Sequence, residues 1–116
     1  MSDSSMPMVL VVEDEALIRV DVTGILEDAG FKVAEAGTGE RAITQLDSAD
    51  VQHRAVITDI NLGGPVSGWE VARQARLRQP DIAIIYVSSV SQAEWAAEGV
   101  PNSILVQKPF AGAQLV

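Results

Sequence analysis

Residues 8–30, MVLVVEDEALIRVDVTGILEDAG, contain the pattern that decides the fold. The run from Val9 to Val12 is apolar and mostly β-branched, which is typical of a short strand buried on both faces. From Glu15 onward apolar residues recur at helical spacing until Gly30, a residue type that commonly ends helices. The stretch therefore predicts a buried strand followed by a helix over 15–29. The apolar positions of this expected helix are Leu17, Ile18, Val22, Ile25 and Leu26.

The same alternation of strands and helices recurs along the chain. Residues 61–68 contain three glycines and a proline and predict a loop. Strands alternating with helices predict an α/β fold, a doubly wound parallel sheet with helices on both faces. Further strands are expected at 31–36, 54–58, 82–87 and 104–106, and further helices at 40–46, 67–79 and 91–98. The expected buried side of the third helix comprises Trp69, Val71, Ala72, Ala75 and Leu77.

Composition excludes several classes of protein. Of the 116 residues 47% are apolar and 21% charged, which indicates a folded domain rather than disorder. The net charge is −8 and the basic residues are scattered, which argues against direct nucleic-acid binding. No apolar run approaches the roughly 18 residues of a membrane helix, and the N-terminus lacks the basic flank of a secretory signal. With no cysteine in the chain, a cytoplasmic location is expected.

Polar side chains follow four of the five expected strands. Glu13 and Asp14 come after the first strand, Asp59 after the third, Ser88 after the fourth and Lys108 after the fifth. In an open parallel sheet, ligands bind outside the carboxyl ends of the strands. We therefore expect these five side chains to converge at one edge of the sheet.

This set of residues predicts a site for phosphoryl transfer. Three carboxylates in one cleft repel one another unless a cation neutralises them. Oxygen ligands without histidine or cysteine favour Mg²⁺ over zinc. Lys108 can pair with Asp59, and the Ser88 hydroxyl can donate to a phosphate oxygen. Nucleophile, metal, cation and hydroxyl donor are the parts that phosphoryl transfer requires.

Four segments resemble those of the response-regulator receiver family of two-component signal transduction: VVEDE (11–15), TDINLGG (58–64), YVSS (86–89) and QKPF (107–110). The resemblance implies a chemotaxis-regulator-like domain over 8–116 after a disordered segment at 1–7. It also implies the flavodoxin-like strand order 2-1-3-4-5.

The resemblance also implies a role for each site residue. Asp59 corresponds to the phosphorylated aspartate, Ser88 to the conserved hydroxyl and Lys108 to the invariant lysine. Glu13, Asp14 and Asp59 would bind Mg²⁺, with the main-chain carbonyl of Asn61 as a further ligand. The bond from Lys108 to Pro109 is expected to be cis, an isomer that bonds before proline adopt at small cost.

By this resemblance the chain takes a phosphoryl group from a histidine kinase or a histidine phosphotransfer protein and changes conformation. It is not an enzyme beyond Mg²⁺-dependent self-phosphorylation and autodephosphorylation. One alternative is a degenerate receiver that only binds partners, but such a domain has usually lost one of these residues. Another is an aspartate phosphatase of the haloacid dehalogenase type. Its nucleophile follows the first strand and has an acid two residues on, whereas Asp59 follows the third strand and is followed by Asn61.

Several features depart from the family pattern. The family carries an aromatic residue three positions before the lysine, and this residue changes rotamer on phosphorylation. Leu105 stands at that position here, and Tyr86 is the alternative residue for the role. The spacing from Ser88 to Lys108 is shorter than in the common family pattern, so a short or irregular fourth helix is expected. His53, without a histidine or cysteine partner, is expected on the surface.

The fifth helix is expected to be truncated or absent, because only 111–116 remain after Phe110. Apolar surface near the first helix and the first and fifth strands would then be exposed. Self-association, for example as a homodimer, is expected from such a surface.

Overall fold

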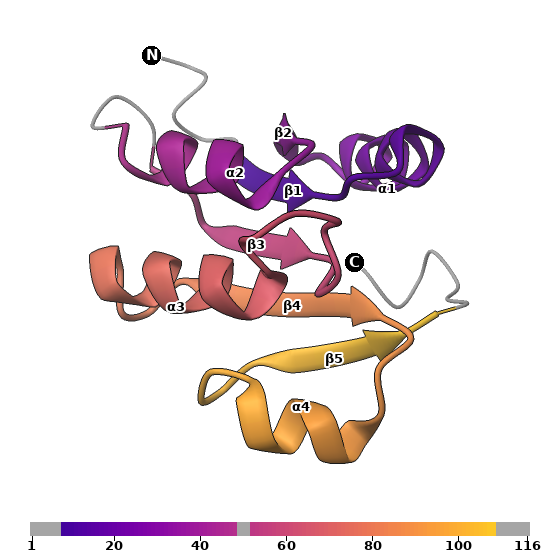
Figure 1. Cartoon of the computed structure of the whole chain (residues 1–116). Helices are drawn as coiled ribbons and strands as arrows, with labels where there is room; N and C mark the ends of the chain where they lie inside the picture. The colour runs from indigo at the N-terminus through magenta and orange to yellow at the C-terminus, as the bar shows by residue number, and fades with distance from the viewer. Residues whose placement is uncertain (1–7, 49–51, 109–116) are drawn as a thin grey trace.

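Five parallel strands form one sheet in the order β2-β1-β3-β4-β5 (Figure 1), the flavodoxin-like order expected from the sequence. The structure is a computed structural model that describes residues 8–48 and 52–108. The strands are Met8–Val12 (β1), Lys32–Ala36 (β2), Ala55–Thr58 (β3), Ala83–Ser88 (β4) and Ile104–Gln107 (β5). The helices are Ala16–Asp28 (α1), Gly39–Leu46 (α2), Gly68–Arg78 (α3) and Gln92–Glu98 (α4). All the described strands and helices were predicted, with ends that differ by at most one residue.

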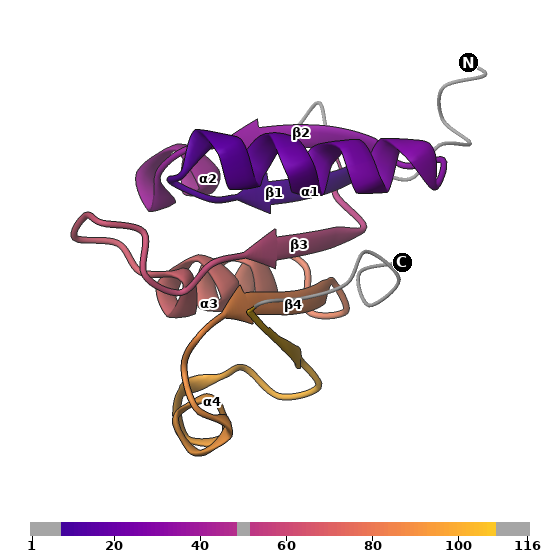
Figure 2. The same ribbon diagram turned by 90° about the vertical axis from the view of Figure 1, so that its right-hand side faces the viewer.

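The sheet separates two apolar layers. Successive residues of a strand point to opposite faces, so Val9 and Val11 lie in one layer and Leu10 and Val12 in the other. The first layer packs against α1, which lies across β1 and β2 with α2 and α3 behind the sheet (Figure 2). The second layer packs against α2 and α3, with Trp95 of α4 at its margin. Both faces are therefore covered, as a doubly wound fold requires.

The strand ladder continues one residue past the carboxyl ends of β1, β3 and β5. The amide of Glu13 donates to the carbonyl of Ala36 at 3.1 Å, and that of Asp59 donates to Val12 at 3.0 Å. The amide of Lys108 donates to the carbonyl of Ser88, also at 3.0 Å. These three hydrogen bonds place the candidate residues side by side on one edge of the sheet.

Two leucines expected in the core are exposed instead. Leu17 in the first turn of α1 is 87% exposed, and Leu77 near the end of α3 is 75% exposed. Each lies near a helix end, where the apolar stripe no longer faces the sheet. Helical spacing alone does not show where a helix extends beyond the surface that it covers.

His53 was predicted on the surface and is buried, at 3% exposure. The amide of the next residue, Arg54, donates to the carbonyl of Met8, so the chain is already tied to the sheet at this point. The carbonyl of His53 accepts a hydrogen bond from Gln79 Nε2 at 2.9 Å. Burial lowers the pKa of the imidazole, which favours its neutral form.

Some expectations concern residues outside the described part. They are the disordered segment 1–7, the truncated or absent fifth helix and the cis bond before Pro109. Within the described residues, Val20 and Leu17 on α1 and Ile104 on β5 are exposed apolar side chains. Self-association stays a prediction. None of the described helices is long and apolar enough to cross a membrane.

Gly68 begins α3 at a point where its backbone meets the end of β3. Its amide donates to the carbonyl of Ile60 at 2.8 Å, and the Ser67 hydroxyl caps the helix by accepting from the amide of Glu70. A Cβ atom at Gly68 would lie 2.0 Å from the Asp59 carbonyl oxygen and 2.8 Å from the Ile60 Cα. Both are backbone atoms, so a side chain here displaces the segment that carries Asp59.

Gly68→Ala is therefore expected to lower the free energy of unfolding by about 2 kcal/mol. The matched control is Gly24→Ala inside α1, where an added Cβ meets no atom within 4 Å. That control should raise stability by about 0.5–1 kcal/mol, because alanine loses less backbone entropy in a helix. Urea denaturation of both variants measures the difference. Equal stability of the two variants would contradict the close approach at Gly68.

Candidate functional site

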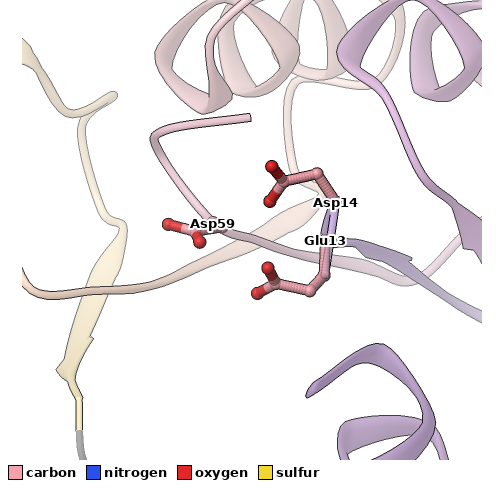
Figure 3. A group of neighbouring side chains, drawn as sticks. All are labelled: Glu13, Asp14 and Asp59. Atoms are coloured by element: carbon pink, nitrogen blue, oxygen red, sulfur yellow. The ribbon is translucent and has the colours of Figure 1, made fainter. Parts of the chain in front are cut away.

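Three carboxylates converge at the carboxyl edge of the sheet, as expected from their positions after β1 and β3. Figure 3 shows Glu13 and Asp14 beside Asp59. One carboxylate oxygen of each lies within 4.8 Å of those of the other two. Glu13 and Asp59 are buried, at 4% and 8% exposure, whereas Asp14 is exposed. The group is therefore an acidic cluster, half inside the protein and open to solvent on the side of Asp14.

Lys108 brings the balancing positive charge from the end of β5. Its Nζ atom lies 3.0 Å from Asp59 Oδ2 and 3.4 Å from Glu13 Oε1. Burial alone would lower the pKa of Lys108, but the hydrogen bond to Asp59 and the charges of Asp59 and Glu13 outweigh this and raise it. The ammonium group therefore stays charged, and it neutralises only one of the three carboxylates.

Asp59 is held at both carboxylate oxygens. Oδ1 accepts a hydrogen bond from the amide of Ile60 at 2.6 Å, and Oδ2 accepts from Lys108. The hydroxyl of Thr58 donates to the Asp59 carbonyl at 2.7 Å. The side chain and the main chain of Asp59 are thus both held by hydrogen bonds, which restricts the position and the orientation of the carboxylate.

Ser88 and Asn61 complete the predicted set. Ser88 is the last residue of β4, is 2% exposed, and its carbonyl accepts the Lys108 amide. Asn61 is exposed in the loop after β3. The structure thus brings Glu13, Asp14, Asp59 and Lys108 together directly and ties Ser88 to Lys108 through the main chain. The metal role of the Asn61 carbonyl stays a prediction.

Two residues beside the acidic cluster, Gly63 and Arg19, were not predicted from the sequence. Gly63 has a φ of +74°, and a Cβ there would come within 3.1 Å of Asp14 Oδ2. The run of glycines after Asp59 was the only signal for it. Arg19 donates from Nη1 to the carbonyl of Glu13 at 2.6 Å, a contact that no sequence motif indicates.

Leu105 occupies the position of the expected switch aromatic and is half-buried against the core. The large aromatic of this region is Tyr86, which is fully buried with its ring edge-to-face against Trp69 at 4.9 Å. Burial raises the pKa of its phenol, and its oxygen accepts a hydrogen bond from the amide of Val100. Tyr86 therefore connects β4, two residues before Ser88, to the loop that follows α4.

Burial disfavours ionisation of the Glu13 carboxyl. Burial raises the pKa of its carboxyl to about 7, although the amide hydrogen bond from Glu15 partly offsets this; the charge of Asp59 adds to the increase. In the unfolded chain the ordinary value of 4.5 applies. The folded protein therefore binds a proton more tightly than the unfolded chain between these two values.

The free energy of unfolding in metal-free buffer should accordingly decrease as the pH rises from 5 to 8. The favourable contribution of protonated Glu13 is complete below pH 4.5 and is lost as the pH rises through 7. Glu13→Gln removes this titration, so its stability relative to wild type should rise by about 3 kcal/mol across that range. Denaturation at both pH values in the presence of EDTA measures it. If the free energy of unfolding changes with pH in the same way in wild type and Glu13→Gln, ionisation of Glu13 costs little in the folded protein.

Known proteins are similar to this chain in sequence and fold. The family model of the response regulator receiver domain matches residues 9–116. The crystal structure of a response regulator receiver protein from Sinorhizobium medicae WSM419 is 41% identical, with a TM-score of 0.92 over 97% of this chain and 90% of that chain. The chemotaxis protein CheY4 of Vibrio cholerae is 27% identical, with a TM-score of 0.85 over 96% of this chain and 93% of that chain.

A curated relative extends the match to a longer protein. The C4-dicarboxylate transport transcriptional regulatory protein DctD of Rhizobium meliloti is 30% identical over 115 residues, which are 97% of this chain and 24% of DctD. The first curated relatives are likewise much longer, and the chain spans about a quarter of their length or less. The family model, the strand order and the acidic cluster agree, and the chain belongs to the family of response regulator receiver domains.

Proposed function

We propose that the chain accepts a phosphoryl group on Asp59 from a histidine kinase or a histidine phosphotransfer protein, in a reaction that depends on Mg²⁺. The observation that carries the proposal is the buried Asp59 carboxylate, hydrogen-bonded to Lys108 and grouped with two further carboxylates. The family of the chain supports the same function. No other catalytic activity is proposed beyond self-phosphorylation and autodephosphorylation.

In the proposed reaction, a carboxylate oxygen of Asp59 attacks the phosphorus of a phosphohistidine. The bond from phosphorus to nitrogen breaks as the bond from phosphorus to oxygen forms, and the donor imidazole takes up a proton and leaves neutral. The product is an acyl phosphate, which water later hydrolyses to restore the carboxylate. The hydrogen bond from the Ile60 amide to Oδ1 limits rotation of the Asp59 carboxylate before attack.

The donor atoms of the cluster suit Mg²⁺. Glu13, Asp14 and Asp59 offer three carboxylate oxygens within 4.8 Å, and hard oxygen ligands favour this ion. The carbonyl of Asn61 is proposed as a further ligand. When bound, Mg²⁺ supplies positive charge that neutralises the carboxylates and the phosphate oxygens.

Lys108 and Ser88 act on the phosphoryl group itself. At rest the Lys108 ammonium donates to Asp59 Oδ2 at 3.0 Å, and after transfer it donates to a phosphoryl oxygen near the same position. The Ser88 hydroxyl donates to a second phosphoryl oxygen. Movement of Ser88 toward that oxygen would pull on β4 and, through the Tyr86 hydroxyl, on the amide of Val100. We propose that the conformational change follows this route, in place of a rotamer change of an aromatic residue at position 105.

The proposed setting is the cytoplasm, with a kinase or phosphotransfer protein as the partner and no direct contact with nucleic acid. The chain has a net charge of −8 with scattered basic residues, which disfavours binding to a phosphate backbone. The alternative, a receiver that binds partners without phosphorylation, requires a defect in the acceptor site. The contacts of Asp59 and Lys108 with the acidic cluster give no sign of one.

Incubation with acetyl phosphate and Mg²⁺ should add one phosphoryl group, seen by intact-mass analysis. Asp59→Asn should abolish the added mass, because an amide is not a nucleophile for phosphorus. The matched control is Asp81→Asn, since Asp81 is exposed in the turn before β4 and should leave phosphorylation unchanged. Equal labelling of the Asp59 variant would assign the phosphate to another residue. A wild type that stays unlabelled even with a histidine kinase active on other receivers would favour the partner-binding alternative.

A further inference from the structure

Arg19 in the first turns of α1 reaches back to the acidic cluster. Its Nη1 atom donates to the carbonyl of Glu13 at 2.6 Å, and its Nε atom donates to Glu35 Oε1 on β2 at 3.1 Å. The Arg19 side chain is 23% exposed. One arginine thus joins the end of β1, the start of α1 and the neighbouring strand β2.

The carbonyl that Arg19 holds belongs to the peptide between Glu13 and Asp14. On the other side of Glu13, the amide is fixed by the carbonyl of Ala36, the residue after Glu35 on β2. The two peptide groups that flank Glu13 are therefore both tied toward the end of β2. Because a peptide group is planar, fixing its carbonyl also fixes the direction in which the chain enters Asp14.

Asp14 depends on this constraint more than the other two acids. Glu13 is buried and paired with Lys108, and the Asp59 carboxylate accepts hydrogen bonds at both oxygens. Asp14 is exposed, and Gly63 opposite it has no side chain to pack against it. The direction of the Glu13 to Asp14 peptide thus helps to set where the Asp14 carboxylate lies, together with the side-chain hydrogen bond between Asp14 and Glu13.

We propose that Arg19 is a positioning residue of the metal site. Its charge-assisted hydrogen bond holds the peptide between Glu13 and Asp14 so that the Asp14 carboxylate stays within ligand distance of the other two acids. Arg19 touches neither the metal nor the phosphate. The inference rests on the proposed function, because it concerns the Mg²⁺ site of the phosphorylation reaction.

The test compares Arg19→Met with Glu35→Gln. Methionine keeps an apolar stem of similar length but removes the guanidinium. Glutamine at 35 removes the ion pair but leaves the Arg19 hydrogen bond to the Glu13 carbonyl. Titration calorimetry with MgCl₂ should show about tenfold weaker Mg²⁺ binding for Arg19→Met, in the range seen when residues behind metal ligands are removed. Glu35→Gln should bind within about twofold of wild type, since a partly exposed ion pair contributes little.

A second readout separates positioning from a general structural role. At saturating Mg²⁺ the rate of labelling by acetyl phosphate should be the same in Arg19→Met and wild type, because only occupancy of the site is impaired. Unchanged Mg²⁺ affinity in Arg19→Met, or equal loss of affinity in Glu35→Gln, would overturn the inference. A labelling rate that stays low at saturating Mg²⁺ would also overturn it. If the wild type itself binds no Mg²⁺, the proposed function fails, a result distinct from these.

Discussion

Mutual repulsion of three carboxylates is the constraint around which this domain is organised. Their oxygens lie within 4.8 Å of one another, and two of the three side chains are buried. Such a group is unfavourable unless positive charge or protons balance it. Lys108 supplies one positive charge against three carboxylates, and burial together with the charge of Asp59 raises the pKa of Glu13 to about 7. The remaining negative charge supports the proposal that a divalent cation binds at this cluster.

The backbone makes this arrangement possible. The ladder bonds at Glu13, Asp59 and Lys108 join the ends of β1, β3 and β5 to the neighbouring strands β2, β1 and β4, so that residues far apart in sequence lie along one edge of the sheet. The core beneath them is apolar on both faces of the sheet, which leaves the carboxyl edge as the place where polar groups gather. At Gly68 the start of α3 comes so close to the Asp59 carbonyl that no side chain fits. The Asp59 carboxylate is therefore positioned by main-chain contacts as well as by Lys108.

Much of this could be predicted from the sequence. Apolar β-branched runs that alternate with helical spacing led to every described strand and helix, and placement at strand ends brought together the acids and Lys108. Features that depend on tertiary packing could not be found in this way. The burial of His53 depends on how the first and third strands begin together, and the exposure of Leu17 on where α1 extends past the sheet. The contact of Arg19 with a main-chain carbonyl has no sequence pattern, because any residue supplies that acceptor.

The most direct test of the account is the amide NMR spectrum of the domain with Mg²⁺ and beryllofluoride, which mimics a phosphoryl group on a carboxylate. We expect saturable shifts that require Mg²⁺, at the amides of Ile60 and Lys108 beside Asp59 and also at Val100, which Tyr86 connects to β4. Asp59→Asn should show none of them. A wild-type spectrum unchanged by beryllofluoride, or the same shifts in Asp59→Asn, would contradict the assignment of Asp59 as the phosphoryl acceptor.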